Sequence, residues 1–413
     1  MAPMPTEKAY WEDGHRRRFE GTGATFARFG DRTSIVLPRT FFYPAAGGQL
    51  GDRGTLTIGG VTWTVTDTQI DDAGTIHHLV ADRVESDVDD APSGAHDPEH
   101  RAVVGEIDRT FRDDQRAHHT AQHMLSRAFV DVAGAETTSA RLGTSVATID
   151  LAVPSLADAD VLRAETLTND VVLSNVVVRT HFPSAAELLA MPLRRAPKVT
   201  ENVRVVEVEG FDVSPCGGTH CKGTGEIGTV RIVGTERYKG GTRVSFVAAR
   251  RAIEDSRSNH AIVASLAKTF SCGAHDLPNA VARLGRDGKD RAAALEAAQS
   301  ELATFVAEAI LRDRPPSPTG TTHIVLHRPG ADVPTLRALA GRLTSRSDVV
   351  ALCTGGPAET GEKPAVLQRG ATADFDCGAF WKRTLAPAGA KGGGRADRAE
   401  GRFPASLETT GLF

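Results

Sequence analysis

The sequence predicts an α+β protein of several domains: a small N-terminal β-barrel, an α+β domain, a helical hairpin and a C-terminal α/β domain. Three observations support this fold class. Up to about residue 95, short runs of alternating apolar and polar residues are separated by Gly, Asp and Pro, as in the short strands of a barrel. Strand-like and helix-like runs then mix until about residue 250. From there to about 313 the sequence is helical, and a mixed pattern returns after it.

The first two domains are expected at 1–95 and 99–250, separated by a Pro-, Asp- and His-rich break at 89–98. In the second domain the mixed order implies a sheet with its helices on one side. The barrel strands are expected at 33–37, 54–58, 61–66 and 75–80. The elements expected in the second domain are strands at 102–107, 146–151, 176–181, 203–209, 229–234 and 242–248 and helices at 112–132, 156–174 and 184–190.

The third domain is expected at 251–313 and the fourth at 320–413. Leu295, Leu302, Val306 and Ile310 follow one another at spacings of seven and four, which favours an antiparallel helical hairpin or a short coiled coil. A Pro-rich linker at 314–320 ends this part. Strands expected at 322–326 and 349–352 then alternate with helical runs.

Composition narrows the class of protein. The 413 residues are 24% charged and 40% hydrophobic, which is typical of a folded globular chain. No apolar run approaches the roughly 20 residues of a membrane span, and the N-terminus lacks a signal-peptide pattern. The five cysteines are odd in number and scattered, which favours a reducing compartment, and we expect a cytoplasmic protein without a membrane partner.

A net charge of -4 does not favour an extended nucleic-acid surface, but local basic clusters can still bind phosphates. A solvated surface is the alternative interpretation of each cluster. The clusters are Arg194, Arg195 and Lys198, then Arg237, Lys239 and Arg243, and finally Lys391 and Arg395.

Two pairs of nitrogen and sulfur donors predict a metal site. His119 and His123 stand four residues apart, on one face of the expected helix at 112–132. Cys216 and His220 bracket a loop with two glycines, tight enough for both side chains to face one point. Together they form the ligand set of one tetrahedral zinc ion per chain, although each pair alone is also common without a metal. Thr120 stands where the metalloprotease motif needs a glutamate, which excludes that reaction.

The segments His119-Thr-Ala-Gln-His123 and Cys216-Gly-Gly-Thr-His220 resemble the editing domain of alanyl-tRNA synthetase and its free-standing relatives, the AlaX alanyl-tRNA editing proteins. The resemblance extends over nearly the whole chain. It implies a hydrolase that cleaves the ester of mischarged Ser-tRNA(Ala), and also of Gly-tRNA(Ala). Because the aminoacylation domain of a synthetase precedes the part that this chain resembles, we expect no aminoacylation activity.

The resemblance also implies further site residues. The glycine-rich motif at 41–54 is expected beside the acceptor end of the tRNA; a tight turn and the tripeptide of peptide release factors are the alternatives for its Gly-Gly-Gln. Cys221 follows the ligand loop and is expected to be a bystander. Catalytic or neighbouring roles are expected for Gln122, His118 and Thr138, of which Thr138 is the first choice for distinguishing serine from alanine. Substrate contacts are expected from Gly47, Gly48, Gln49, Thr137, Ser139, Gly217, Gly218 and Thr219.

The segment Ala390-Lys-Gly-Gly-Gly-Arg395 resembles the glycine motif of the synthetase's C-terminal domain, which contacts the tRNA elbow and mediates dimerisation. Ala390 replaces the motif's first glycine, and a flexible hinge is the alternative interpretation. The resemblance thus implies tRNA(Ala) as a partner and a homodimer through the C-terminal region. Threonyl-tRNA editing and a non-catalytic, zinc-stabilised RNA-binding protein remain open as other functions. The residues expected to bind tRNA are Arg243, Lys391, Gly392, Gly393, Gly394 and Arg395.

Overall fold

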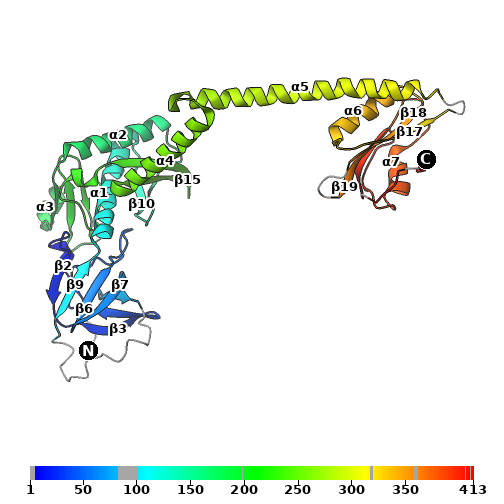
Figure 1. Ribbon diagram of the computed structural model, residues 1–413. Coiled ribbons are helices and arrows are strands. Elements are labelled where there is room, and N and C mark those ends of the chain that lie inside the picture. The colour runs from blue at the N-terminus through cyan, green and yellow to red at the C-terminus, as the bar shows by residue number, and fades with distance from the viewer. Residues whose placement is uncertain are drawn as a thin grey trace. The chain divides into compact units, whose positions relative to one another are not determined.

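The computed structural model describes residues 5–81, 101–197, 199–316, 320–356, 361–404, 406–409 and 411–413. The expected break at 89–98, residue Lys198 and residues 317–319 of the expected linker lie outside this part. The chain forms two compact units, Met1–Ala264 and Ser265–Phe413 (Figure 1). Several sheets and helices make up the units, so the predicted α+β, multidomain class is confirmed.

The first unit begins with a seven-stranded sheet in the order β2-β9-β6-β7-β8-β4-β3. All of its strand pairs are antiparallel, and buried Ile35, Leu56 and Val65 contribute to one core. The expected closed barrel is not found: closure requires paired end strands, and among the described residues β2 and β3 do not pair. The strands are β2 (Arg18–Gly21), β3 (Thr25–Phe29), β4 (Arg32–Val36), β6 (Gly54–Ile58), β7 (Val61–Ile70), β8 (Ile76–Val80) and β9 (Val103–Ile107).

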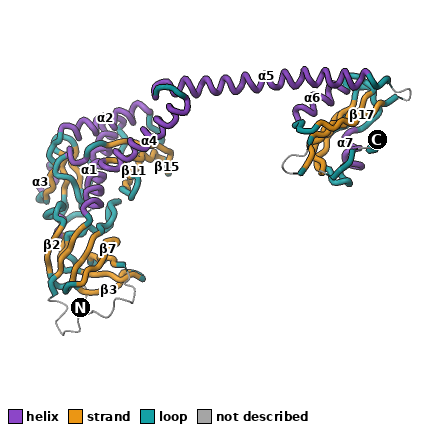
Figure 2. The backbone as a smooth tube through the Cα atoms, viewed as in Figure 1, coloured by secondary structure: helices purple, strands orange, loops and turns teal. Residues whose placement is uncertain are grey.

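A four-stranded sheet in the order β10-β11-β16-β15 packs with helices α1 (Arg109–Ala133) and α2 (Asp158–Ser174). The Asp108 carboxylate accepts the amide of Phe111 at the start of α1, and Gly134 in the left-handed conformation ends it. Met124, Leu125 and Phe129 of α1 are buried in the core that α1 shares with this sheet. Figure 2 shows α1 and α2 beside strands β11 and β15. The strands are β10 (Thr137–Arg141), β11 (Ala147–Leu151), β15 (Val230–Tyr238) and β16 (Gly241–Ala248).

A small sheet in the order β12-β13-β14 completes the first unit and positions the loop that carries Cys216. The backbone carbonyl of Arg204 accepts the amide of Cys216, which holds the start of that loop beside the residue that precedes β13. The elements are β12 (Val178–His181), α3 (Ala185–Ala190), β13 (Val205–Val208), β14 (Asp212–Pro215) and a 3₁₀ turn at Thr224–Ile227. A short parallel pair, β1 (Glu7–Lys8) and β5 (Arg39–Thr40), lies near the N-terminus.

The second unit contains a mixed sheet in the order β17-β18-β19-β21-β20, covered on both faces. Ala303 and Ala307 of α5 pack with α6 on one face, and Trp381 packs on the other. Helix α4 (Ala249–Phe270) extends across the boundary between the units, and its pairing with α5 stays a prediction. The elements are α5 (Leu277–Arg312), β17 (Thr322–Arg328), α6 (Val333–Leu343), β18 (Val349–Gly355), β19 (Glu362–Arg369), α7 (Cys377–Phe380), β20 (Lys391–Gly394) and β21 (Arg398–Pro404).

The glycine segment near the C-terminus differs from the expected loop. Lys391–Gly394 forms the edge strand β20, which pairs antiparallel with β21, and Lys391 forms an ion pair with Glu362. Gly392 and Gly394 approach the backbone of β21 so closely that a Cβ at either position would overlap it. The glycines therefore serve strand pairing. Within the described residues, no helix is both long and apolar enough to cross a membrane.

Candidate metal centre

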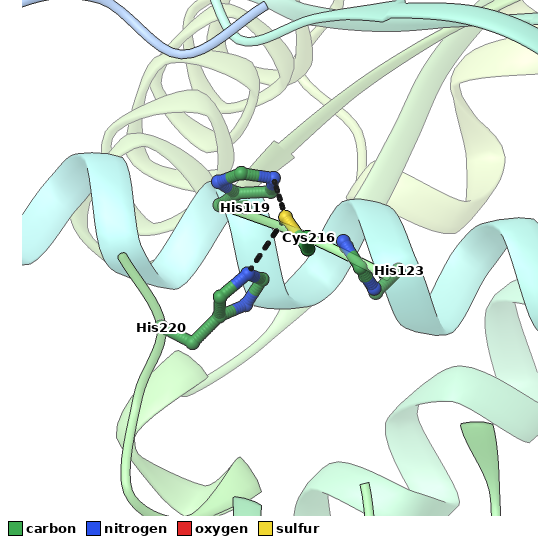
Figure 3. A group of neighbouring side chains, drawn as sticks. All are labelled: His119, His123, Cys216 and His220. Atoms are coloured by element: carbon green, nitrogen blue, oxygen red, sulfur yellow. Dashed lines mark hydrogen bonds between the residues drawn. The ribbon is translucent and has the colours of Figure 1, made fainter. Parts of the chain in front are cut away.

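Four side chains from two distant segments converge in the first unit. Helix α1 carries His119 and His123 one turn apart, and the loop after β14 carries Cys216 and His220. Their ligand atoms all lie within 4.8 Å of one another (Figure 3). The three histidines are buried and Cys216 is partly exposed. The structure thus brings together the four donors that the sequence analysis selected.

Cys216 lies at the centre of this group. Its Sγ is 3.3 Å from His119 Nε2 and 3.4 Å from His220 Nε2. Burial favours the neutral thiol, but the neighbouring His119, His123 and His220 hold the pKa of Cys216 well below its usual range. Burial also lowers the pKa of His220, so its imidazole stays neutral. A thiolate and neutral imidazoles are the protonation states that a metal ion binds.

An acceptor outside the cluster faces the Nδ1 atom of His123. Asp212 Oδ2 lies 3.4 Å from that atom, and both side chains are buried. Although burial alone would lower the pKa of His123, the nearby Cys216 and Asp212 raise it. Arg194 and Ser214 in turn bond to Asp212 at 2.7 and 2.9 Å. The Asp212 carboxylate is therefore held in place while it orients the imidazole.

Thr120 performs the same task for His220. Its hydroxyl donates to the carbonyl of Arg116 at 2.9 Å, so its oxygen is left to accept. It accepts the amide of Cys221 at 3.1 Å and lies 3.3 Å from His220 Nδ1. Sequence reasoning noted Thr120 only as a missing glutamate and missed Asp212, because no spacing rule links either residue to the loop. Cys221 is outside the donor group, and burial raises its pKa to about 12, as expected of a bystander.

The donor set fits a zinc ion. One sulfur and three nitrogen donors are of the types and number that a tetrahedral zinc ion binds, and their ligand atoms lie within 4.8 Å of one another. Since His123 Nδ1 has no hydrogen bond of good geometry and faces Asp212, its other nitrogen is available to the cluster. The residues present are therefore suited to hold the ion that the sequence analysis predicts.

A cavity of about 590 Å³ lies beside the cluster. His119 and Cys216 are the two donors among its lining residues, so the cluster opens on that side. Aromatic Tyr10, Trp11 and Tyr43 and the cations of Lys8, Arg195 and Arg204 contribute other parts of the wall. The sequence-predicted residues in the lining are Gly47, Gln122, Thr137, Thr138, Ser139, Gly217 and Gly218.

His118 does not belong to this site. Its Nδ1 lies 2.8 Å from the carbonyl of Asp114, and its Nε2 accepts the amide of Ala248 at 3.0 Å. Burial lowers its pKa, as expected for a histidine held neutral by two backbone bonds. The predicted catalytic role is therefore replaced by a structural one: the side chain ties α1 to the end of β16. The position of His118, about 100° round the helix from His119, indicated a place beside the metal ligands, but it does not reveal the bond to Ala248, which is 130 positions away.

A second cavity, of about 900 Å³, adjoins the first and shares Thr138 and Ser139 with it. Arg141, Tyr238 and Lys239 are in its lining. Arg243, predicted to bind tRNA, also lies here, but its guanidinium already bonds to Asp150 at 2.7 and 3.0 Å and stacks on Tyr238. The other residues predicted to bind tRNA, 391–395, lie in the second unit.

Comparison with known proteins places these residues in a family. Residues 203–245, which include Cys216 and His220, match the family of the threonyl and alanyl tRNA synthetase second additional domain. The chain is 29% identical over 359 residues to the alanine–tRNA ligase of Halorubrum lacusprofundi, covering 85% of this chain and 37% of that protein. It is 31% identical over 319 residues to the ligase of Methanopyrus kandleri, covering 75% and 33%. Over most of its length the chain is thus similar to part of the alanyl-tRNA synthetases.

The similarity is partial on the synthetase side. The chain spans about a third of the length of those two ligases and 44% of the one from Methanobrevibacter smithii, to which it is 26% identical. A search of solved structures found the crystal structure of the C-Ala domain of Aquifex aeolicus alanyl-tRNA synthetase at 19% identity. That match covers 22% of this chain and 84% of the other with a TM-score of 0.21, too low to establish a shared fold.

Proposed function

We propose that this AlaX-like chain hydrolyses the ester bond of serine, and of glycine, mischarged to tRNA(Ala). His119, His123, Cys216 and His220 hold one zinc ion in this proposal. The observation that supports it best is the convergence of these four donors beside a cavity of about 590 Å³. The similarity to alanine–tRNA ligases supports the choice of tRNA.

The geometry suits hydrolysis at the open side of the cluster. Four protein donors are typical of a closed structural zinc site, whereas a catalytic site keeps one position accessible. Cys216 is the one donor that is partly exposed, and it lines the cavity, so a bound ester meets the cluster at this residue first. When bound there, a zinc ion supplies Lewis-acid chemistry that polarises a water or an ester carbonyl.

The cavity wall suits the aminoacylated 3' end of a tRNA. A terminal adenine stacks on aromatic rings, and such a contact contributes about 1–3 kcal/mol per base. Trp11 is held in the wall by a 2.9 Å bond from its Nε1 to the carbonyl of Gly217 and has the Lys8 ammonium 4.8 Å from its ring. Lys8 and Arg195 provide positive charge for the phosphates that follow the adenosine.

Discrimination between serine and alanine requires a polar partner in this cavity. An unpaired polar group costs about 1–3 kcal/mol, which penalises alanine if that partner is otherwise buried. Thr138 is exposed in the free protein and meets this condition only when the bound 3' end covers it. It is our first choice because its hydroxyl donates to the carbonyl of Asp150 at 3.1 Å and its oxygen keeps a lone pair to accept the hydroxyl of serine. Gln122 is a second group of this kind, because its amide nitrogen donates to Ser126 and no bond to its carbonyl oxygen is seen among the described residues.

Threonyl-tRNA editing is a second candidate, since the matching domain family includes threonyl tRNA synthetases. The test is deacylation of Ser-, Gly- and Ala-tRNA(Ala) and of Ser-tRNA(Thr) side by side, with and without a chelator. We expect Ser- and Gly-tRNA(Ala) to be hydrolysed, Ala-tRNA(Ala) to be spared, and His123→Ala to be inactive. Full activity of a metal-free protein would refute the zinc part, and preferential cleavage of Ser-tRNA(Thr) would favour the second candidate.

Removing the metal also distinguishes an editing enzyme from an RNA-binding protein in which zinc only stabilises the fold. A zinc-stabilised RNA-binding protein would lose its fold with the metal, whereas an editing enzyme of this design keeps its helices. Circular dichroism of the chelated protein, recorded beside the activity, distinguishes these outcomes.

A further inference from the structure

Gln49 lies at the metal centre although it belongs to the N-terminal segment. It follows Gly47 and Gly48 in a turn closed by paired backbone bonds between Ala46 and Gln49. Its side chain is only 2% exposed, and it is 70 positions from His119 in the sequence. The sequence analysis assigned Gln49 to the substrate, but the residue is absent from the lining of the 590 Å³ cavity.

The three polar contacts of Gln49 fix the orientation of its amide. The backbone N–H of Thr219 can only donate, so the atom that it meets at 3.0 Å must be Gln49 Oε1. The amide nitrogen on the other side donates to Thr219 Oγ1 at 2.8 Å. The same Oε1 atom lies 2.8 Å from His119 Nδ1. Because Oε1 has no proton to give, Nδ1 carries the hydrogen of this bond.

This bond selects one tautomer of His119. With the proton on Nδ1, the lone pair is on Nε2, which is the atom that faces Cys216 Sγ at 3.3 Å. Gln49 thus does for His119 what Asp212 does for His123 and Thr120 for His220. The three acceptors come from three separate segments of the chain, and each faces the outer nitrogen of one imidazole.

We propose that Gln49 is a positioning residue of the metal centre, which orients His119 for the ion and makes the N-terminal segment part of the site. The inference rests on the proposed zinc site and not on the tRNA reaction. Gly218 supports the arrangement, since a Cβ there would overlap the His119 ring and lie 2.9 Å from Gln49 Oε1. The close approach of loop, glutamine and histidine requires a residue without a side chain at this position.

The test compares three variants of the full chain in their affinity for Zn²⁺, measured by competition with a chromophoric chelator. Gln49→Leu removes the acceptor, and we expect zinc to bind about 10- to 100-fold more weakly. Gln49→Glu keeps an acceptor oxygen and should bind zinc at least as tightly as the wild type. Gln115→Leu is the matched control: Gln115 is also buried and accepts the amide of Leu50 at 3.2 Å, but it lies outside the donor group, so zinc affinity should not change.

Cobalt substitution gives a second readout that does not depend on activity. In Gln49→Glu the carboxylate makes His119 a stronger donor, so the visible absorption of bound Co²⁺ should shift, while Gln115→Leu should match the wild type. If Gln49→Leu does not fold, as judged by circular dichroism without metal, the cobalt spectrum of Gln49→Glu decides: a shift supports the proposal and an unchanged spectrum overturns it.

Wild-type zinc affinity in a folded Gln49→Leu protein would also overturn the proposal. If that variant bound zinc normally but no longer deacylated mischarged tRNA, Gln49 would be a substrate contact. The proposed function fails separately. If the wild type binds zinc, Gln49→Leu weakens that binding, and no mischarged tRNA is hydrolysed, the positioning role stands and the editing assignment falls.

Discussion

Asp212 and His123 form a buried pair in which the carboxylate Oδ2 lies 3.4 Å from the imidazole Nδ1. Arg194 neutralises the same carboxylate at 2.7 Å, and together with His123 it keeps the pKa of Asp212 far below its usual range although burial favours the acid. Asp212 is therefore ionised at any pH at which a metal binds. It is the negative charge nearest the outer side of the histidine pair on α1.

Replacing Asp212 should weaken the metal site and the fold together. Asp212→Ala leaves the buried guanidinium of Arg194 without its anionic partner and with the Ser214 hydroxyl as its only acceptor among the described residues, which should cost about 3–5 kcal/mol of unfolding free energy. Asp212→Asn should reduce zinc affinity about 10- to 100-fold. Glu207→Gln, on neighbouring strand β13, changes the net charge equally and serves as the control in denaturant unfolding and chelator competition. Equal zinc affinity in Asp212→Asn and Glu207→Gln would contradict the role of Asp212.

The two glycines between Cys216 and His220 should respond differently to alanine. At Gly218 a Cβ would overlap the His119 ring, whereas at Gly217 its nearest neighbour is the Trp11 ring at 3.9 Å. Gly218→Ala should therefore displace His119 and abolish zinc binding and deacylation, and Gly217→Ala should bind zinc as the wild type does. Metal content after dialysis gives the answer. Full metal loading of Gly218→Ala would show that the loop adjusts.

A similar pair precedes Gln49. A Cβ at Gly48 would overlap the carbonyl oxygen of Ala140 on β10, and Gly48 has a φ of 88°. Gly47 has a φ of 60° but open space around it, so Gly47→Ala should cost only about 1–2 kcal/mol. Gly48→Ala should in addition push the turn away from β10, the strand that carries Thr138, and lower the rate of Ser-tRNA(Ala) hydrolysis. Comparing the two variants by deacylation rate and thermal unfolding separates backbone strain from the steric effect.

Loss of the Thr138 hydroxyl should change selectivity more than overall fold. Thr138→Val keeps the shape of the side chain but removes the acceptor that we assign to serine, so hydrolysis of Ser-tRNA(Ala) should slow about 5- to 150-fold. Gly-tRNA(Ala) has no hydroxyl to lose and should be hydrolysed at the wild-type rate. An equal loss with both substrates would mean that the threonine acts on the cavity as a whole.

Buried His78 should make stability depend on pH. Burial lowers its pKa to about 4, while the carbonyl of Ile35 and the hydroxyl of Thr40 bond its two nitrogens at 2.8 Å. As the pH falls below about 6.5, the unfolded chain takes up a proton that the folded chain refuses until about 4. His78 therefore lowers the free energy of unfolding by roughly 3 kcal/mol as the pH falls from about 6.5 to about 4. In His78→Gln this component should vanish from the pH dependence of thermal unfolding, and an unchanged profile would contradict it.

Local sequence predicted the elements that carry the donors. The helix expected at 112–132 occurs at Arg109–Ala133, because its apolar spacing, its capping aspartate and its terminal glycine all agree. Each donor pair also followed from a local rule, since two residues a helical turn apart share a helix face and two residues around a tight loop face one point. That the two pairs meet depends on a contact between segments 97 positions apart. Their ligand role remains a prediction.

What local rules could not give depends on contacts between distant segments. Barrel closure depends on whether β2 and β3 meet, which strand alternation does not specify. The glycines at 392–394 were expected in a loop from their resemblance to the synthetase's glycine motif. At Gly392 and Gly394 the backbone of β21 approaches too closely for larger residues. Gln49 was assigned to the substrate since its bonds to Thr219 join positions 170 residues apart.

The long separation between Gln49 and Thr219 in the sequence affects when the proposed zinc site can form. Closing a segment of 170 residues costs more entropy than a local turn, and such long-range contacts form late in folding. Before Gln49 reaches Thr219, His119 is free to rotate and to exchange its tautomer. Under the proposal that this centre holds zinc, tight retention of the ion therefore requires the contact between Gln49 and the Cys216 loop, and a chain that stops before residue 220 also lacks the His220 donor.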